Sequence, residues 1–95
     1  MNVEIDKRVY KDTDKLPSYA QALAKEQIMK LLNANELTDL HHVRQMEGTD
    51  EPYYRLKFGS YRYMMYYDSE KKVVTILSLS HRKDAYKKHN LPWRK

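Results

Sequence analysis

The sequence predicts an α+β fold, in which an N-terminal strand and a helical hairpin pack on a twisted, mainly antiparallel sheet of three or four strands, with a short C-terminal helix. Three observations lead to this prediction. The first part of the chain has a helical apolar period, the second part changes to a period of two, and only two glycines and three prolines interrupt the 95 residues. The length suits one core, so we expect residues 1–95 to form a single domain.

A strand and a short helix open the predicted order of elements. Val3 and Ile5 alternate with polar residues, which indicates a short strand with one buried face, at an edge of the sheet. Asp6 can cap a helix that continues toward Leu16. Pro17 disfavours helical backbone at the residue before it, so a break is expected there.

The second helix has the clearest helical pattern in the chain. Ser18 and Gln21 stand three residues apart, as in a capping box at a helix start. Asn33 and Asn35 are reasonable terminators, and we expect a connector over 36–42. The stripe expected to face the sheet consists of Ala20, Leu23, Ala24, Ile28, Leu31 and Leu32.

From Val43 onward the pattern is that of an antiparallel meander. Gly59–Ser60 and Ser69–Glu70 suit tight turns between neighbouring strands. A closing helix is expected over 81–89, before Pro92 prevents its continuation. The strands are expected at about Val43–Glu47, Tyr53–Phe58, Tyr61–Asp68 and Lys72–Ser80.

Side-chain alternation separates a basic face of the sheet from a core face. Arg55 and Lys57 point one way in their strand, whereas Leu56 and Phe58 point the other. In the next strand, Arg62 lies on the face opposite to a core-facing set formed by Tyr61, Tyr63, Met65 and Tyr67. The basic side chains should therefore gather on the open face.

The end of the last strand directs Arg82 away from the core. Alternation places His81 on the core side, and Arg82 on the side of Ser78 and Ser80. If a helix begins there, Tyr86 lies four residues after Arg82 and shares its helical face. We favour a structural role for His81 and keep a catalytic role as second choice. The residues expected to face the helices are Val73, Thr75, Leu77 and Leu79.

The composition restricts the classes of partner and chemistry. Eighteen Lys and Arg against 13 Asp and Glu give a net charge of +5, which favours an anionic partner such as RNA, DNA, an acidic protein segment or a membrane surface. The absence of cysteine excludes thiolate catalysis and Cys-based zinc sites, and we expect no metal or cofactor. No apolar run suits a membrane span, and the first residues lack the apolar stretch of a signal peptide. We therefore expect a cytoplasmic protein.

A simpler interpretation of the same residues stands beside the functional one. Lys and Arg on exposed strand faces commonly keep a protein soluble or protect a sheet edge. Tyrosines in strands most often pack in the core or across strands, and those assigned to packing are Tyr54, Tyr61, Tyr63 and Tyr67. Charge alone is a weak signal.

A series of motifs in the C-terminal half carries a family resemblance. The segment YYRLKFGSYRYMMYYDSEKKVVTILSLSHRKDAYKK has a basic strand, a turn, a Tyr-Arg strand, and a later strand that ends in a His-Arg pair followed by a Tyr. This arrangement resembles the RelE/ParE superfamily of bacterial toxins from type II toxin–antitoxin systems. The resemblance implies a RelE-like α+β fold. In the RelE branch it also implies cleavage of messenger RNA, typically in the ribosomal A site, which a cognate antitoxin blocks.

The resemblance also implies a set of site residues. The catalytic positions fall on Lys57, Arg62, Arg82 and Tyr86. The positions assigned to RNA binding are Arg55, Lys83 and Lys87. In such cleavage the 2′-hydroxyl of the substrate attacks the adjacent phosphate, and guanidinium groups suit the charge that develops there. The lysine is a candidate base, because neighbouring arginines disfavour its charged form, and the tyrosine could orient the nucleophile, stack on a base or transfer a proton.

The expected partners follow from the same resemblance. They are a cognate antitoxin, messenger RNA and the ribosome, with operator DNA reached only through the antitoxin. Two other functions stay open: inhibition of DNA gyrase, as in the ParE branch, and a non-catalytic nucleic-acid-binding module on the same fold. We favour the RelE branch, because the ParE branch lacks a complete set of such catalytic residues.

Overall fold

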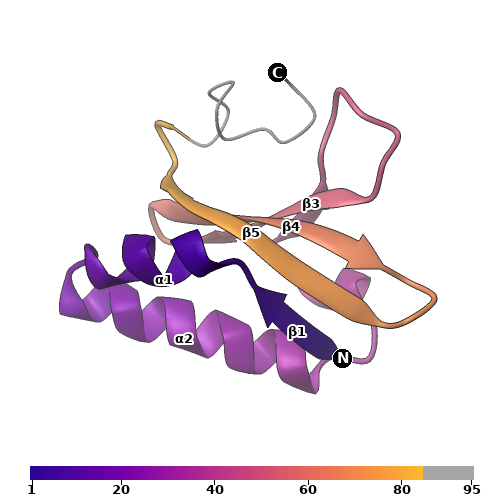
Figure 1. Ribbon diagram of the computed structural model, residues 1–95, viewed down its shortest axis with the longest axis horizontal. Coiled ribbons are helices and arrows are strands. Elements are labelled where there is room, and N and C mark those ends of the chain that lie inside the picture. The colour runs from indigo at the N-terminus through magenta and orange to yellow at the C-terminus, as the bar shows by residue number, and fades with distance from the viewer. Residues whose placement is uncertain (85–95) are drawn as a thin grey trace.

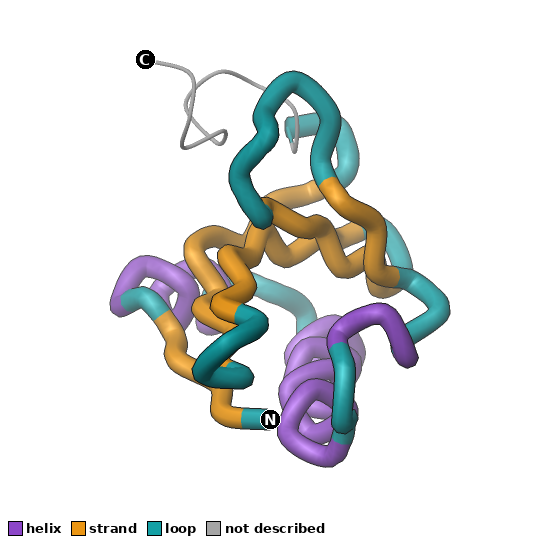
Figure 2. Tube along the Cα trace, turned by 90° about the vertical axis from the view of Figure 1, so that its right-hand side faces the viewer, coloured by secondary structure: helices purple, strands orange, loops and turns teal. Residues whose placement is uncertain are grey.

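The computed structural model describes residues 1–84 as two layers, with two helices covering one face of a five-stranded sheet (Figure 1, Figure 2). The predicted α+β class is confirmed, as is the order of strand, helical hairpin and meander. The elements are β1 (Asn2–Ile5), α1 (Lys7–Asp14), α2 (Ser18–Asn33), the 3₁₀ helix η1 (Leu37–Asp39), β2 (Val43–Gln45), β3 (Tyr53–Phe58), β4 (Tyr61–Asp68) and β5 (Val73–His81).

The strands form one sheet in the order β1-β5-β4-β3-β2. The meander from β2 to β5 is antiparallel throughout. The N-terminal strand joins it as a fifth strand, because β1 pairs in parallel with β5, from Asn2 opposite Val73 to Ile5 opposite Ile76. Its position at the edge of the sheet agrees with the sequence-based expectation.

The turn into α1 follows the predicted chemistry. The side chain of Asp6 accepts a hydrogen bond from the backbone N–H of Arg8 at 3.0 Å, which satisfies one of the free donors at the helix start. The backbone N–H of Asp6 itself donates to the carbonyl of Ile76 at 2.9 Å. The helix therefore begins directly beside the sheet.

The predicted capping box of α2 is wrong. Ser18 is already the first residue of the helix, so Pro17 is the N-cap, and its side chain has no polar atom that could form a cap bond. Gln21 instead donates from Nε2 to the carbonyl of Leu16 at 3.0 Å and to that of Asp14 at 3.4 Å. Asp14 is the last residue of α1 and Leu16 lies just beyond it, where carbonyls lack helical partners, so the amide of Gln21 joins the two helices.

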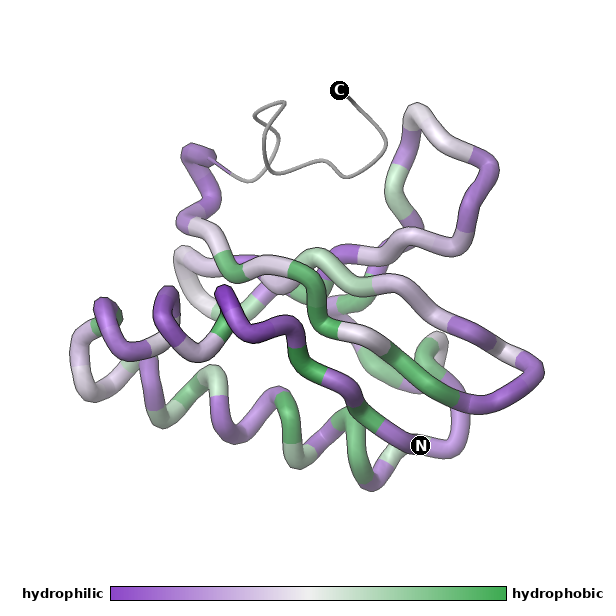
Figure 3. The backbone as a smooth tube through the Cα atoms, in the orientation of Figure 1, coloured by the Kyte–Doolittle hydropathy of each residue, from purple (hydrophilic) through white to green (hydrophobic). Residues whose placement is uncertain are grey.

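The core lies between the helices and the sheet, and hydrophobic positions recur along α2 and β5 in Figure 3. Tyr63 is fully buried and donates from its hydroxyl to the carbonyl of Ala24 at 3.4 Å, while burial raises the pKa of Tyr63 to about 12. Leu32 was expected in the buried stripe but is 44% exposed, whereas Gln27 is buried. The buried stripe of α2 is narrower than predicted, because Leu32 follows Leu31 directly and so points to another side.

A register shift interrupts the pairing of β4 with β5. Met64 lies opposite Ser78, but Met65 lies opposite Ile76, so Leu77 is the extra residue of a β-bulge. Before the bulge, the side chains of β5 therefore point to the face opposite to the one that simple alternation assigns. Val74 and Ile76 therefore pack in the core in place of the predicted Val73, Thr75 and Leu77, whereas Leu79 packs there as predicted.

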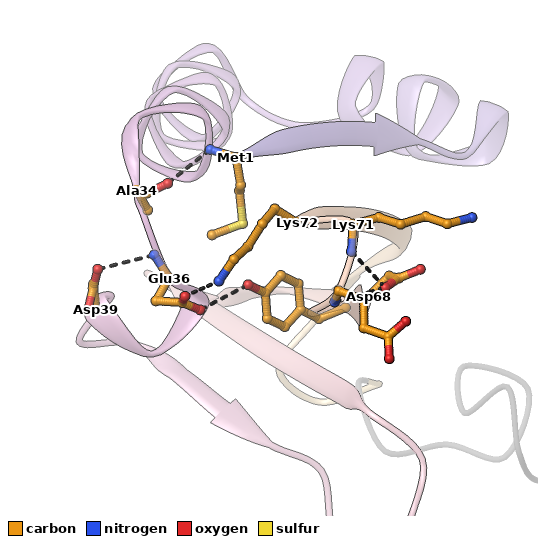
Figure 4. Close-up of polar contacts among 9 residues, drawn as sticks. Met1, Ala34, Glu36, Asp39, Asp68, Lys71 and Lys72 are labelled. Carbon is orange, nitrogen blue, oxygen red and sulfur yellow. Dashed lines mark hydrogen bonds and ion pairs between the residues drawn. The ribbon is translucent and has the colours of Figure 1, made fainter.

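The connector after α2 contacts the sheet where β4 ends and β5 begins (Figure 4). The carboxylate of Glu36 accepts a hydrogen bond from the hydroxyl of Tyr67 at 3.1 Å and pairs with the ammonium group of Lys72. These two bonds, that of Lys72 above all, lower the pKa of Glu36. Leu37 follows in the buried core, and the expected connector includes a short 3₁₀ helix.

Candidate nucleic-acid interface

The face of the sheet opposite the helices carries cations from neighbouring strands. Lys57 on β3 lies directly opposite Arg62 on β4, and Arg62 lies opposite Ser80 on β5. All three residues are on the open side, because Leu56, Tyr63 and Leu79 next to them are buried in the core. The sequence-based placement of Lys57 and Arg62 on one face is therefore correct.

Arg62 combines partial burial with an unsatisfied charge. Its Nε and Nη1 atoms are buried and have no hydrogen-bond partner among residues 1–84. Buried donors are nearly always paired, and an unpaired charged donor is costly. A phosphate group accepts hydrogen bonds from a guanidinium in a fork geometry, so a phosphate that reached the guanidinium of Arg62 would supply the missing acceptors.

Arg55 extends the basic face toward β2. It is half-buried and lies opposite Met64 on β4 on one side and opposite Arg44 on β2 on the other. Arg44 was missed as a site residue. The signal was available, because buried Val43 fixes the core side of β2 and the next residue must point to the open face.

Arg82 lies directly beyond the end of β5. Its backbone N–H donates to the carbonyl of Ser60 at 2.7 Å, which continues the β4–β5 pairing into the turn between β3 and β4. The side chains of Arg82 and Lys83 are exposed. The predicted helix does not begin at His81, which still belongs to β5, and residues 82–84 form a turn.

Two of the predicted site residues, Tyr86 and Lys87, lie outside the described residues, as does the rest of the expected closing helix. His81 lies on the core side, as expected, where its ring packs edge-on against Tyr61 with 5.6 Å between centroids. Its Nδ1 accepts a hydrogen bond from the backbone N–H of Lys83 at 3.2 Å. These contacts are those of a packing residue.

A small apolar cluster lies beside the cations on the open face. Met46 and Met64 are buried, and Tyr53 and Leu77 pack against them. The bulge at Leu77 brings this side chain to the open face. Basic and apolar side chains therefore lie next to each other on this face, since Arg55 is directly opposite Met64, and this arrangement suits a partner with both charged and apolar groups.

Neither a metal centre nor a membrane segment is found in the part of the chain that the structure describes. Residues 1–84 contain no group of three His, Asp or Glu side chains that could hold a metal ion. In the same range no helix is long and apolar enough to cross a membrane.

The fold and this site define a class of small α+β proteins with cations on the open face of the sheet. Residues 3–86 match the family described as ParE toxin of type II toxin–antitoxin system, parDE. The chain belongs to this family, within the RelE/ParE superfamily of toxins.

Relatives and solved structures agree with this assignment. The chain is 34% identical over 89 residues to a protein designated toxin RelE1 from Methanocaldococcus jannaschii, covering 90% of this chain and 94% of that protein. It is similar in fold to the archaeal RelE–RelB complex from Pyrococcus horikoshii OT3, with a TM-score of 0.72, 29% identity, and coverage of 85% and 93% of the two chains. The RelB–RelE antitoxin–toxin complex from Methanococcus jannaschii gives a TM-score of 0.72 at 23% identity, covering 87% and 94%.

Proposed function

We propose that this toxin is an endoribonuclease that cleaves messenger RNA on the ribosome and thereby stops translation. One observation carries the proposal: Arg62, directly opposite Lys57 on the open face, has buried guanidinium donors that find no partner within residues 1–84. A cation of this kind, fixed before the substrate arrives, is suited to charge that develops on a phosphate in the transition state.

The chemistry assigns a separate task to each side chain. The 2′-hydroxyl of the RNA attacks the adjacent phosphate, and a 2′,3′-cyclic phosphate and a 5′-hydroxyl result. Arg62 and Arg82 stabilise the extra negative charge, because a guanidinium stays cationic and forks onto phosphate oxygens. Lys57 is the candidate base that takes the proton of the 2′-hydroxyl, and Tyr86 orients the nucleophile, stacks on a base or takes part in the proton transfer to the leaving 5′-oxygen.

The proposal includes a protein partner. Solved structures similar in fold to this chain are of RelE toxins together with RelB antitoxins. By analogy, a cognate antitoxin binds this toxin in the cytoplasm, covers the basic face and links the toxin to operator DNA. Co-purification with the product of the neighbouring gene, and relief of growth arrest by it, test this part of the proposal.

The nuclease activity is tested by replacing Arg82 with Ala. An exposed arginine contributes little to stability, usually within about 0.5 kcal/mol, so folding should be unchanged. Cleavage of ribosome-bound message in single-turnover assays should fall on the order of 10²-fold. Parental cleavage by saturating Arg82→Ala protein would make Arg82 a binding residue only, and absence of cleavage by the parental protein would overturn the nuclease proposal.

Inhibition of DNA gyrase is the second candidate function, because the matching family is described by its ParE members. A gyrase-directed toxin needs no chemistry of its own. A supercoiling assay with purified gyrase separates the two functions: inhibition without any RNA cleavage in a translation extract would favour this second candidate.

A further inference from the structure

Two backbone hydrogen bonds shape the turn that carries Arg82. The backbone N–H of Arg82 donates to the carbonyl of Ser60 at 2.7 Å, and the backbone N–H of Asp84 donates to the carbonyl of His81 at 2.8 Å. The first bond joins the turn to the neighbouring β3–β4 turn, beside which β5 ends (Figure 1). Neither bond depends on a side chain, so both would survive most substitutions.

A side chain supplies a third hydrogen bond in this turn. The Nδ1 atom of His81 accepts from the backbone N–H of Lys83 at 3.2 Å, so residue 81 binds the N–H two positions further along the chain. Asn, Asp and Ser side chains form equivalent bonds in many turns. The Nδ1 atom can accept only while it carries no proton, so the neutral imidazole has its proton on Nε2. The bond closes a loop around Arg82, the one residue between His81 and Lys83.

The imidazole that forms this bond is held by the core. His81 lies opposite Tyr61 in the β4–β5 ladder, and the two rings meet edge-on with 5.6 Å between their centroids. Tyr61 in turn packs against buried Phe58, with 6.1 Å between the ring centroids. A row of three rings therefore connects the turn to the core. Because the imidazole is already ordered by this packing, its bond to the turn costs little further side-chain entropy.

The side chain of Arg82 depends on the turn for its direction. It is exposed, and among residues 1–84 it forms no ion pair that would hold it in place. The turn therefore sets the direction in which the side chain leaves the backbone. A displacement of about 1 Å at a catalytic group can lower a rate about 10²-fold. The bond from Lys83 to His81 is thus placed where it can affect the proposed reaction.

We propose that His81 is a positioning residue, whose Nδ1 atom holds the turn so that Arg82 is presented to the reacting phosphate. The inference rests on the proposed function for the role of Arg82. The imidazole takes no part in bond making, since its ring packs against Tyr61 on the core side. Loss of the acceptor should therefore lower kcat and kcat/KM together, the pattern of an interaction made in the transition state.

Two variants separate the acceptor from the ring. His81→Phe keeps an aromatic ring against Tyr61 but has no acceptor, whereas His81→Asn keeps an acceptor for the N–H of Lys83 and loses the ring. In single-turnover cleavage of ribosome-bound message, His81→Phe should be slower by about tenfold or more, and His81→Asn should stay within about threefold of the parental rate. A role in packing alone predicts the reverse order of the two variants, and that order would exclude the proposal.

A double variant tests whether His81 acts through Arg82. In the Arg82→Ala background no guanidinium is left to position, so His81→Phe should cause no further loss, whereas independent effects would multiply. His41→Phe makes the same substitution at an exposed position in the connector and should cleave at the parental rate within about twofold. A further tenfold loss in the double variant would show that His81 acts independently of Arg82.

Amide hydrogen exchange at Lys83 measures the turn without any cleavage. Exchange should be about fivefold faster in His81→Phe than in the parental protein, as expected for one lost hydrogen bond, and close to parental in His81→Asn. Equal exchange in all three proteins would overturn the proposal. If exchange responds as expected but the parental protein cleaves no message, the hold of His81 on the turn stands and the nuclease proposal fails.

Discussion

Arg62 illustrates how one side chain can oppose stability and serve activity. Its buried Nε and Nη1 atoms have no partner in residues 1–84, and leaving a buried donor unsatisfied costs on the order of 1–3 kcal/mol. Replacing an unpaired buried charge by an apolar group of similar length removes that cost. Substitution of Arg62 should therefore lower activity without lowering stability, whereas substitution of an ordinary core residue lowers both.

We expect Arg62→Met to leave the free energy of unfolding equal to that of the parental protein or raise it by about 1 kcal/mol, measured by urea denaturation. Cleavage of ribosome-bound message should fall on the order of 10²-fold or more, because a preorganised charge contact is lost. Arg62→Lys is the matched control and should cleave at an intermediate rate. A destabilised but active Arg62→Met protein would contradict this interpretation.

At the residue scale, the sequence could predict the side chains whose face is set by regular alternation. Lys57, Arg55 and Arg62 belong to two strands that pair without interruption, so their common face followed directly from the pattern. Gln21 could not be predicted in the same way. Its partners are carbonyls at the end of another helix, and only the packing of α1 against α2 brings them within reach.

At the scale of elements, the bulge in β5 was invisible in the sequence. All residues from Val73 to Leu77 suit a strand, so nothing in their type marks Leu77 as the extra residue. The bulge is fixed by the register in which β5 pairs with the neighbouring strand β4, and the residue types alone do not set that register. Simple alternation therefore assigned the wrong face to the predicted core residues before the bulge, and the correct face to Leu79 and His81 after it.

The turn between β3 and β4 sets the register of Lys57 with Arg62, and Gly59 adopts a positive φ of 59° there. Gly59→Ala should destabilise the protein by about 1 kcal/mol, because a Cβ atom disfavours this left-handed backbone. Steric clash is not the cause, since the added Cβ would lie 3.8 Å from Leu23.

Urea denaturation measures the effect, and Gly59→Asn provides the control, since Asn tolerates this backbone conformation better than Ala. Equal stability of the Ala variant and the parental protein would show that the turn adjusts without strain.

The contact of Glu36 with Tyr67 and Lys72 predicts a pH dependence of stability. Because the bond from Lys72, then that from Tyr67, lowers the folded-state pKa of Glu36 below its ordinary 4.5, its contribution is present above pH 4.5 and is lost as the pH falls through the lower folded-state pKa. Glu36→Gln should therefore be less stable than the parental protein at pH 7, and the difference should disappear in acid.

Thermal melts at both pH values measure this effect. Glu26→Gln, which removes a carboxylate from an exposed pair with Lys30, should change stability little at either pH. A difference between the Glu36 variant and the parental protein that persists in acid would exclude the carboxylate as its source.

At the scale of the whole molecule, the sequence predicted the fold because its signals agreed with one another. A helical stripe, a period-two meander and two breaks at Pro17 and Gly59 all indicated the same two-layer arrangement. The pairing of β1 with β5 and the course of the connector from Glu36 depend on contacts between distant segments. Such contacts are formed by the folded chain and have no local pattern.

The proposed reaction site supplies positive charge but no strong base within residues 1–84. The strand residues at the proposed reaction site, Lys57, Arg62 and Ser80, include two cations but no carboxylate or histidine that could serve as a strong base, and His81 packs against Tyr61 on the core side. Positioning of the substrate by a second body must then supply much of the barrier reduction, and well-oriented reactants can gain about 7–11 kcal/mol in this way. Messenger RNA held in a translating ribosome provides such orientation.

We therefore expect cleavage of ribosome-bound message to exceed cleavage of the same naked RNA by at least about 10³-fold, compared at equal toxin concentration by mapping new 5′ ends. Ribosomes stalled with an occupied A site serve as the control and should protect the message. Equal rates on naked and ribosome-bound RNA would place the full catalytic power in the toxin itself, and the search for a base would then move to the residues beyond Asp84.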